Sequence, residues 1–300
     1  MKQTLVIGST VVDVFLSIPY LPKRGEDVNI LSSEYRIGGC AFNVFKTLRL
    51  FGSPALLCSP VGEGIFAEMV RKRLEEEGIV PFVNLKEENG CCYCLVEPDG
   101  ERSFLSLHGA EYKFSRSWME KVDCAQTADI FICGLEVEEQ TGNEIIDFTY
   151  EHPDLKLYFA PGPRIKYIGD DKINRILKRR DLNGSGPFLH LNELEALRVS
   201  GEHKYREAAE YLTEKTENGI VITLGERGCY YKDQSMEALV PGFPVTVLDT
   251  VGAGDTHCGA LIACLKKGMP PAEACLIANK TGAATVSTKG DVPFKLPDFA

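Results

Sequence analysis

"PFLHLNELEALRVSG", residues 187–201, joins a short apolar run directly to a helix-like segment. The apolar run through Leu191 has the length and composition of a buried strand. Asn192 and Glu195 then have the spacing of a helix start, and Gly201 follows as a typical helix stop. Other strand-like runs, most of them ending in turn residues, lie at residues 4–10, 55–61, 129–135, 155–161 and 219–225.

Helix-like segments separate these runs. They lie at residues 40–52, 66–78, 143–152, 171–180, 192–201 and 205–219, and several of them end on glycine. Strands that alternate with helices favour an open, mostly parallel sheet that is covered by helices. The sequence therefore predicts an α/β fold, with one main domain over residues 1–300.

Two segments break the alternation, at about residues 12–37 and 90–112. Both contain strand-like runs without helical cover, and Pro98-Asp99-Gly100 has the composition of a hairpin turn. No Ser/Pro-rich linker or internal repeat separates them from the rest of the chain. We expect them to form a small β-strand lid inserted beside the main sheet.

Composition and charge exclude several classes of protein. With 44% hydrophobic and 25% charged residues the chain is an ordinary globular protein, and its net charge of −10 disfavours binding to nucleic acid or to anionic lipid. No apolar run approaches the roughly 18 residues of a membrane span, and the N-terminal segment is interrupted by Asp13 and predicts a first strand rather than a leader. We expect a cytoplasmic protein without nucleic-acid or membrane partners.

Eleven cysteines raise the question of a metal site or disulfides, above all in "CCYCLV", residues 91–96. Zinc sites usually present CxxC or Cys/His pairs on turns, whereas these cysteines lie in apolar runs. Small buried thiols in a reducing compartment are the favoured interpretation.

"VGAGDTHCGALIACLKKG", residues 251–268, predicts a helix that begins at a glycine turn. The free N–H groups of such a helix start carry partial positive charge, and glycines let an anion approach the backbone, so the turn suits phosphate or a developing oxyanion. Asp255 beside it can take a proton from a hydroxyl. The alternative is that Asp255 only caps the helix. The GxxxxGK[ST] pattern of a P-loop is absent.

A second glycine pattern contains Gly62, Gly64 and Ala67 and matches the GxGxxA form of the dinucleotide fingerprint. The expected acidic residue at the end of the next strand is missing, because Glu87 and Glu88 lie in a polar loop. A tight turn with close helix packing explains these glycines equally well. An NAD-dependent oxidoreductase therefore stays a minor alternative.

The chain resembles the ribokinase-like, or PfkB, family of carbohydrate kinases over nearly its whole length. The residues that carry the resemblance are "GGCAFN" (38–43), "LNELEAL" (191–197), "TLGERG" (223–228) and "DTVGAGDTHCGA" (249–260), in the family order. The resemblance implies a three-layer α/β/α fold and an enzyme that transfers phosphate from ATP to an alcohol. It makes Asp255 the general base, and the backbone amides of Gly252, Ala253 and Gly254 the anion hole.

The resemblance also places an acceptor site at Asp13, Gly38, Gly39, Asn43 and Asp249. Sugar hydroxyls need paired donors and acceptors, and glycines let a ring lie against the backbone. Taken alone, Asn43 is better explained as a helix-surface or capping amide, and Asp13 as a turn residue; their occurrence together in the family order favours binding.

For the cofactor, the resemblance assigns Asn192 and Glu195 to Mg²⁺ and phosphate, with Glu195 as the metal residue, and it places Thr223 and Gly225 near the phosphates and Asn279 at the adenine pocket. Without the neighbouring motifs, Asn192 and Glu195 form an ordinary helix start.

Two further features follow from the same resemblance. "AATVSTKGDVPF", residues 283–294, resembles a loop that binds K⁺ through carbonyl groups together with the segment around Asp249. Ala160 stands where many relatives have an aspartate, whereas Arg164 is kept.

The acceptor is not fixed by the resemblance, because the family phosphorylates ribose, fructose phosphates, sugar acids and nucleosides. We expect the lid to supply specificity through Lys23, Arg36, His108, Glu111 and Tyr112. Few clustered Lys and Arg residues are in place for a phosphorylated acceptor, so an unphosphorylated sugar is favoured, with a nucleoside as the alternative. A non-catalytic sugar-binding homologue is disfavoured by the intact Gly-Ala-Gly-Asp element. Relatives often pair their lids, which implies a homodimer.

Overall fold

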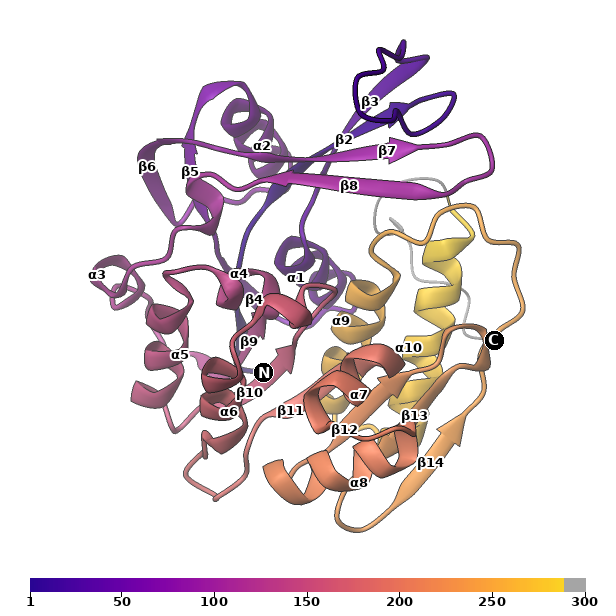
Figure 1. Ribbon diagram of the computed structural model, residues 1–300. Helices are drawn as coiled ribbons and strands as arrows, with labels where there is room; N and C mark the ends of the chain where they lie inside the picture. The colour runs from indigo at the N-terminus through magenta and orange to yellow at the C-terminus, as the bar shows by residue number, and fades with distance from the viewer. Residues whose placement is uncertain (289–300) are drawn as a thin grey trace. The chain divides into compact units, whose positions relative to one another are not determined.

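The computed structural model of the chain describes residues 1–288 and divides into two compact units (Figure 1). The first unit contains Met1–Gly8, Cys40–Cys58 and the chain from Phe114 onward, and the second contains Ser9–Gly39 and Ser59–Lys113.

The described strands of the first unit form an eight-stranded sheet in the order β14-β13-β12-β11-β10-β9-β1-β4. The strands are β1 (Gln3–Ile7), β4 (Ala55–Cys58), β9 (Thr127–Cys133), β10 (Lys156–Ala160), β11 (Phe188–Asn192), β12 (Ile220–Thr223), β13 (Cys229–Lys232) and β14 (Glu237–Val240). The pairs from β4 through β12 are parallel, and β13 and β14 add an antiparallel hairpin. Each of the six apolar runs predicted as buried strands of the main sheet overlaps one of the strands β1, β4 and β9 to β12, which confirms the mostly parallel α/β fold.

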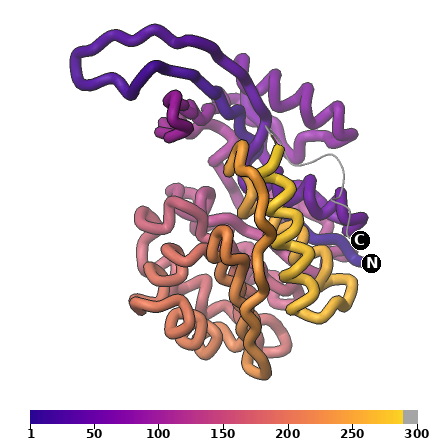
Figure 2. Tube along the Cα trace, turned by 90° about the vertical axis from the view of Figure 1, so that its right-hand side faces the viewer, coloured from indigo at the N-terminus to yellow at the C-terminus, as the bar shows by residue number. Residues whose placement is uncertain are grey.

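Helices cover both faces of this sheet, with α1, α9 and α10 on one side and the helices from α4 to α8 on the other (Figures 1 and 2). The helices are α1 (Cys40–Leu50), α3 (Arg116–Met119), α4 (Gly134–Glu138), α5 (Gly142–Glu151), α6 (Asp170–Lys178), α7 (Glu193–Ser200), α8 (Tyr205–Thr216), α9 (Ala253–Lys266) and α10 (Pro271–Val286), with short 3₁₀ turns η2 (Ile165–Tyr167) and η3 (Gly225–Arg227). The predicted three-layer α/β/α arrangement is therefore confirmed.

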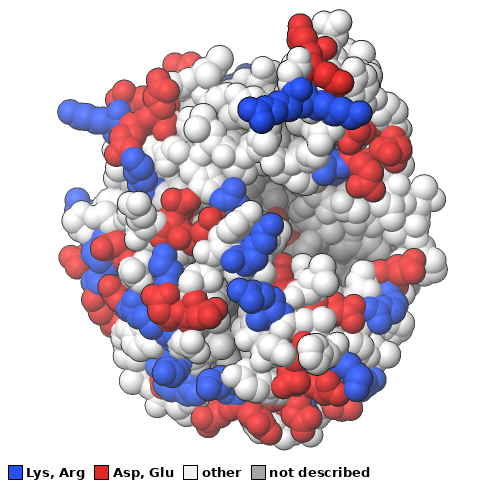
Figure 3. All heavy atoms as spheres, viewed as in Figure 1, with Lys and Arg blue, Asp and Glu red and all other residues white. Residues whose placement is uncertain are grey.

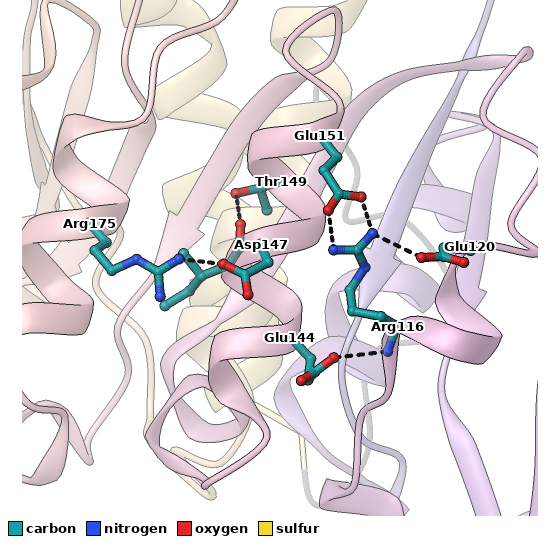
Figure 4. A network of polar contacts seen from close by, with 8 residues as sticks. Arg116, Glu120, Glu144, Asp147, Thr149, Glu151 and Arg175 are labelled. Carbon is teal, nitrogen blue, oxygen red and sulfur yellow. Dashed lines mark hydrogen bonds and ion pairs between the residues drawn. The ribbon is translucent and has the colours of Figure 1, made fainter.

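An ion-pair cluster ties α3 to α5 (Figure 4). The guanidinium of Arg116 contacts the carboxylates of Glu151 and Glu120, and the Arg116 amide donates to Glu144 Oε2 at 3.1 Å. Partly exposed pairs of this kind contribute little individually, so the cluster mainly fixes the orientation of α3.

The second unit is a four-stranded sheet in the order β3-β2-β7-β8, with a separate β5-β6 pair among the described residues. Its elements are β2 (Val11–Ser17), β3 (Ser32–Gly38), β5 (Pro60–Glu63), α2 (Gly64–Glu76), β6 (Val83–Glu88), β7 (Cys91–Val96), β8 (Arg102–Leu107) and the 3₁₀ turn η1 (Ala110–Tyr112). β7 and β8 form the predicted hairpin, in which Gly100 turns with φ +90°.

This second unit is larger than the lid segments predicted from the sequence. It also takes in residues 59–89, and α2 contacts both β2 and β3, so its strands do have helical cover. The sequence pattern could not show this, because the helix of 66–78 reads the same whether it packs on one sheet or the other.

The surface and the helices agree with the composition. On the face shown in Figure 3, acidic and basic side chains are interspersed, without a broad basic area. Within residues 1–288, none of the helices is long and apolar enough to cross a membrane.

Candidate active site

Helix α9 begins at a glycine turn that has no side-chain cap. Gly252 is its N-cap with φ +75°, a left-handed conformation that favours glycine. A Cβ added to Gly254 would meet no other part of the described structure within 4 Å, whereas one on Gly252 would lie 3.3 Å from Asn43 Nδ2, so open space lies beside Gly254. A helix start of this kind can offer backbone amides to an anion, although the Ala253 amide donates to the Thr250 carbonyl oxygen at 3.4 Å.

Asp255 lies in this first turn, but its carboxylate does not serve as a cap. Asn43 Nδ2 donates a hydrogen bond to Asp255 Oδ2 at 2.9 Å, and the Cys40 thiol is a second side-chain partner. Burial raises the pKa of Asp255, and the hydrogen bonds from Asn43 and Cys40 partly oppose this shift. The folded environment therefore favours protonation of this carboxyl group more than water does.

Close packing of α1 against α9 sets the contact between Asn43 and Asp255. A Cβ on Gly259 would lie 2.7 Å from Thr47 Cβ and 3.0 Å from the Val44 carbonyl oxygen, so only glycine lets the helices approach this closely. Asn43 and Asp255 are 212 positions apart in sequence, and the packing of α1 on α9 brings them together.

Asn192 and Glu195 form a capping box at the start of α7. Asn192 Oδ1 accepts from the Glu195 amide at 2.8 Å, Glu195 Oε2 accepts from the Asn192 amide at 3.0 Å, and Asn192 Nδ2 donates to Glu195 Oε1 at 2.7 Å. Burial raises the pKa of Glu195 to about 7, and the charge of Asp255 adds to the shift. The two predicted cofactor residues therefore have a structural role as a cap, and Glu195 lies within electrostatic reach of Asp255.

Thr223 and Gly225 lie beside this capping box. Thr223 is the register partner of Asn192 in the parallel β11-β12 pair, and Gly225 follows with φ +63° at the start of η3. The carboxyl ends of parallel strands are where open α/β sheets bind ligands, so the three residues share the expected edge.

Asn279 takes part in a buried hydrogen-bond chain that the sequence did not indicate. Its Nδ2 donates to the carbonyl oxygens of Val240 at 3.1 Å and Pro241 at 3.0 Å, which leaves Oδ1 to accept from His257 Nε2 at 3.0 Å. His257 Nδ1 then accepts from His190 Nε2 at 2.9 Å. Burial, with His257 adjacent, lowers the pKa of His190 well below its ordinary value, so the His190 ring is neutral.

Asp249 lies in the segment that leads to α9. Its Oδ1 accepts from the Val251 amide at 3.0 Å, and its own amide donates to the Val286 carbonyl at the end of α10, at 3.2 Å. Residues 289–294 of the predicted K⁺ loop lie outside the described residues. Ala160, which stands where many relatives have an aspartate, is the last residue of β10. Arg164 forms an ion pair with Glu138 at 3.0 Å.

Asp13, Gly38 and Gly39 belong to the second unit. Asp13 lies on β2, and a Cβ on Gly38 would lie 2.6 Å from Asp13 Oδ2, so the glycine makes room for this carboxylate. Gly39 has φ +103° and approaches the Ser9 carbonyl, where a Cβ would lie 2.8 Å away.

Among the predicted specificity residues, Glu111 has a structural role instead. Its buried carboxylate accepts from the Gly90 amide at 2.8 Å and the Gly109 amide at 3.0 Å. His108 and Tyr112 stack on each other at 4.0 Å between ring centroids. Arg36 pairs with Glu34 and lies over the Phe15 ring, and Lys23 is exposed.

Gly62 is explained by packing rather than by a dinucleotide site. A Cβ there would lie 2.0 Å from the Glu87 carbonyl oxygen and 2.5 Å from Ala110 Cβ. The close-packing alternative therefore accounts for this glycine without a cofactor.

Comparisons with known proteins agree with one another. The profile of the pfkB family carbohydrate kinases matches residues 1–298. The chain is 32% identical over 296 residues to "Uncharacterized sugar kinase YegV" of Escherichia coli K12, covering 96% of this chain and 90% of the relative. It is 26% identical over 296 residues to the ribokinase of Bacillus subtilis, covering 97% and 94%.

Solved structures share the fold. A ribokinase from Thermotoga maritima superposes with a TM-score of 0.82 at 22% identity, covering 98% of this chain and 96% of its own. A nucleoside kinase from Methanocaldococcus jannaschii has a TM-score of 0.81 at 18% identity, covering 99% and 95%. The Arabidopsis thaliana ribokinase complexed with ribose and ATP has a TM-score of 0.77 at 20% identity, covering 97% and 95%.

Proposed function

Because the chain belongs to the pfkB family of carbohydrate kinases, and is thus a phosphotransferase with an alcohol acceptor, we propose that it uses ATP to phosphorylate a small unphosphorylated sugar, with Asp255 as the general base. The observation that carries this proposal is the state of Asp255. Its carboxylate lies at the start of α9, is held by side chains rather than by the helix amides, and has a raised pKa.

In the proposed reaction, the acceptor hydroxyl gives its proton to Asp255 as its oxygen bonds to the γ-phosphorus, and the bond to the β-phosphate oxygen breaks to release ADP. A base with a raised pKa takes that proton more effectively near neutral pH. The amides of Gly252, Ala253 and Gly254 stabilise charge on the transferring group, which is the main demand of phosphoryl transfer.

The cofactor residues are proposed as follows. Thr223 and Gly225 lie at the strand ends and are assigned to the phosphates of ATP, as the resemblance implies. Asn279 has its amide engaged with Val240, Pro241 and His257, so we assign it to positioning the wall of the adenine pocket.

The carboxylate of Glu195 is a suitable ligand for Mg²⁺, which prefers hard oxygen ligands. A buried carboxyl with a pKa of about 7 is poorly stabilised as an anion, and a bound cation would favour its charged form. Mg²⁺ would neutralise the phosphate oxygens. A similar protein from Escherichia coli, with a TM-score of 0.78, has been solved in complex with ATP and Mg²⁺.

For the acceptor, we assign Asp13, Gly38, Gly39, Asn43 and Asp249. Asp13 and Asn43 offer the acceptor and donor groups that hydroxyls require. Arg36, the basic residue closest in register to Asp13, already pairs with Glu34, which favours an acceptor without a phosphate group.

A coupled ADP-release screen over pentoses, hexoses, sugar acids and nucleosides, with and without K⁺, tests this proposal, and product analysis identifies the phosphorylated hydroxyl. Asp255→Asn should lower kcat by about 10²- to 10⁴-fold and leave the ATP Kd nearly unchanged. Asp147→Asn, which alters a surface carboxylate paired with Arg175, is the control. Turnover within tenfold of wild type in the Asp255 variant would contradict the assignment, and activity confined to nucleosides would select the alternative.

Three further properties complete the proposal: a K⁺ requirement, a cytoplasmic location and a homodimer formed through the second unit. The outer strands of its larger sheet, β3 and β8, expose Tyr35, Phe104, Leu105 and Leu107. Such edges favour pairing with a second copy. Light scattering that finds a monomer at assay concentrations would exclude the dimer.

A further inference from the structure

Three potential metal ligands meet on the larger sheet of the second unit. The carboxylate of Asp13 and the thiols of Cys92 and Cys94 all lie within 4.8 Å of one another. Asp13 and Cys92 are partly exposed, whereas Cys94 is buried.

The strand register explains this meeting. Asp13 of β2 pairs with Cys92 of β7 in a parallel ladder, and paired residues point to the same face. Cys94 is two positions further along, and the period of a strand returns it to that face, while Cys91 points to the other. Cys92 and Cys94 do not have the CxxC spacing of a zinc-binding turn, yet the pairing of β2 with β7 brings both thiols close to the carboxylate of Asp13.

The chemistry of the donors selects the kind of ion. Two thiolates prefer zinc and other thiophilic metals, whereas Mg²⁺ prefers oxygen ligands only. Zinc bonds of about 2.3 Å to sulfur and about 2.1 Å to oxygen require the ligand atoms to lie roughly 3.5–3.8 Å apart. Small side-chain rotations would close the present separation. Ser106 already donates a hydrogen bond to Cys92 Sγ at 3.7 Å, as partners of metal-bound thiolates do.

We infer that Asp13, Cys92 and Cys94 form a binding site for Zn²⁺, and that the bound ion excludes the acceptor. Binding releases the two thiol protons and leaves a fourth position for water. The exclusion rests on the proposed function, in which Asp13 receives hydroxyls of the acceptor, because the ion takes the same carboxylate. Zinc then acts as a competitive inhibitor that excess Mg²⁺ does not displace.

The direct test titrates the full-length, reduced, metal-free protein with Cd²⁺ and follows thiolate-to-cadmium absorption in the ultraviolet. Zn²⁺ is then added in competition. Wild type should bind one ion tightly, and Cys92→Ser, Cys94→Ser and Asp13→Asn should each weaken binding by more than about 100-fold, since even partners of ligands contribute 10- to 100-fold.

Cys91→Ser is the matched control, because it removes the neighbouring thiol on the opposite face, and Cys124→Ser removes a partly exposed thiol of the first unit. Both should keep the tight site. Circular dichroism and thermal melting check the fold of each variant. If Cys94→Ser unfolds, cadmium binding by Cys92→Ser tests the site, because Cys92 is partly exposed. Tight binding retained in Cys92→Ser, or lost equally in the controls, would overturn the site.

The kinetic test separates this inference from the proposed function. Zn²⁺ should raise the KM for the acceptor without changing kcat in wild type, and Cys92→Ser should keep the basal activity but lose this inhibition. The cadmium titration needs no acceptor. A failed acceptor screen would therefore refute the proposed function alone, and an active enzyme without the tight site would refute the zinc site alone. Zinc inhibition that stays non-competitive with acceptor would overturn the exclusion.

Discussion

The hydrogen bond from Asn43 to Asp255 should help to set the position of the acidic limb in the pH profile of kcat. Asn43 Nδ2 lies 2.9 Å from Asp255 Oδ2 and stabilises the ionised carboxylate, which opposes the effect of burial. In Asn43→Ala that support is lost, so the pKa of Asp255 rises further. As a general base requires the ionised form, the acidic limb of the kcat profile should move to higher pH.

The magnitude follows from the kind of bond. A hydrogen bond to a charged group contributes about 1.5–3 kcal/mol, and each 1.36 kcal/mol corresponds to tenfold. At a pH on the acidic limb, kcat of Asn43→Ala should thus fall by about 10- to 150-fold relative to wild type. Cys40 remains as a partner of the carboxylate, which favours the lower end. On the alkaline plateau the two enzymes should be within a few-fold.

The assay is initial-rate ADP release at saturating ATP and acceptor, so that altered acceptor affinity does not enter kcat. Asn143→Ala, which removes a surface amide that accepts from Arg175 at 2.8 Å, is the control, and its profile should overlay that of wild type. A uniform loss of kcat at all pH values, with the limb unmoved, would refute the reasoning and leave Asn43 with a binding role only.

Three other substitutions test the surroundings of the base. The folded-state pKa of Glu195 is about 7, above its ordinary value, so the free energy of unfolding of the wild type should fall by about 3 kcal/mol as pH rises from 4.5 to 7. Urea unfolding at pH 4.5 and 8 should show that Glu195→Gln escapes most of this loss. A difference in unfolding free energy between wild type and variant that is the same at both pH values would contradict this reasoning. Gly259→Ala should cost about 1–3 kcal/mol through its clash with Thr47 and lower kcat, whereas normal melting and kcat would dismiss the packing argument. His257→Leu leaves the Asn279 oxygen without its donor and should lower the free energy of unfolding by about 1–3 kcal/mol, again by urea unfolding; an unchanged value would show that the chain contributes nothing.

The sequence predicted the parallel strands well because each is an apolar run buried on both faces. It missed the β13-β14 hairpin, since polar residues such as Asp233 and Gln234 interrupt that stretch. It also missed α10, whose small residues are apolar around much of the helix and show weak periodicity. The extent of the second unit depends on which sheet each strand joins, and a local pattern does not contain that information.

The site shows the same division. Glycine spacing predicted the start of α9, with Asp255 in its first turn, because a turn and a helix start are local features. The contact of Asp255 with Asn43 depends on helix packing through Gly259, and the meeting of Asp13 with Cys92 depends on strand register. Such long-range pairings could not be read from the sequence.

Two helices of the first unit show how the same position yields different chemistry. Glu195 and Asp255 both stand three residues after an N-cap residue, yet Glu195 accepts the amide of its N-cap Asn192, whereas Asp255 turns to the side chains of Asn43 and Cys40. A carboxylate that satisfies its own helix start neutralises the positive end of that helix. Because Asp255 does not, we expect the start of α9 to keep its attraction for a second anion, beside the carboxylate that the proposed function makes the general base. That separation of roles within one helical turn is what phosphoryl transfer to a hydroxyl requires.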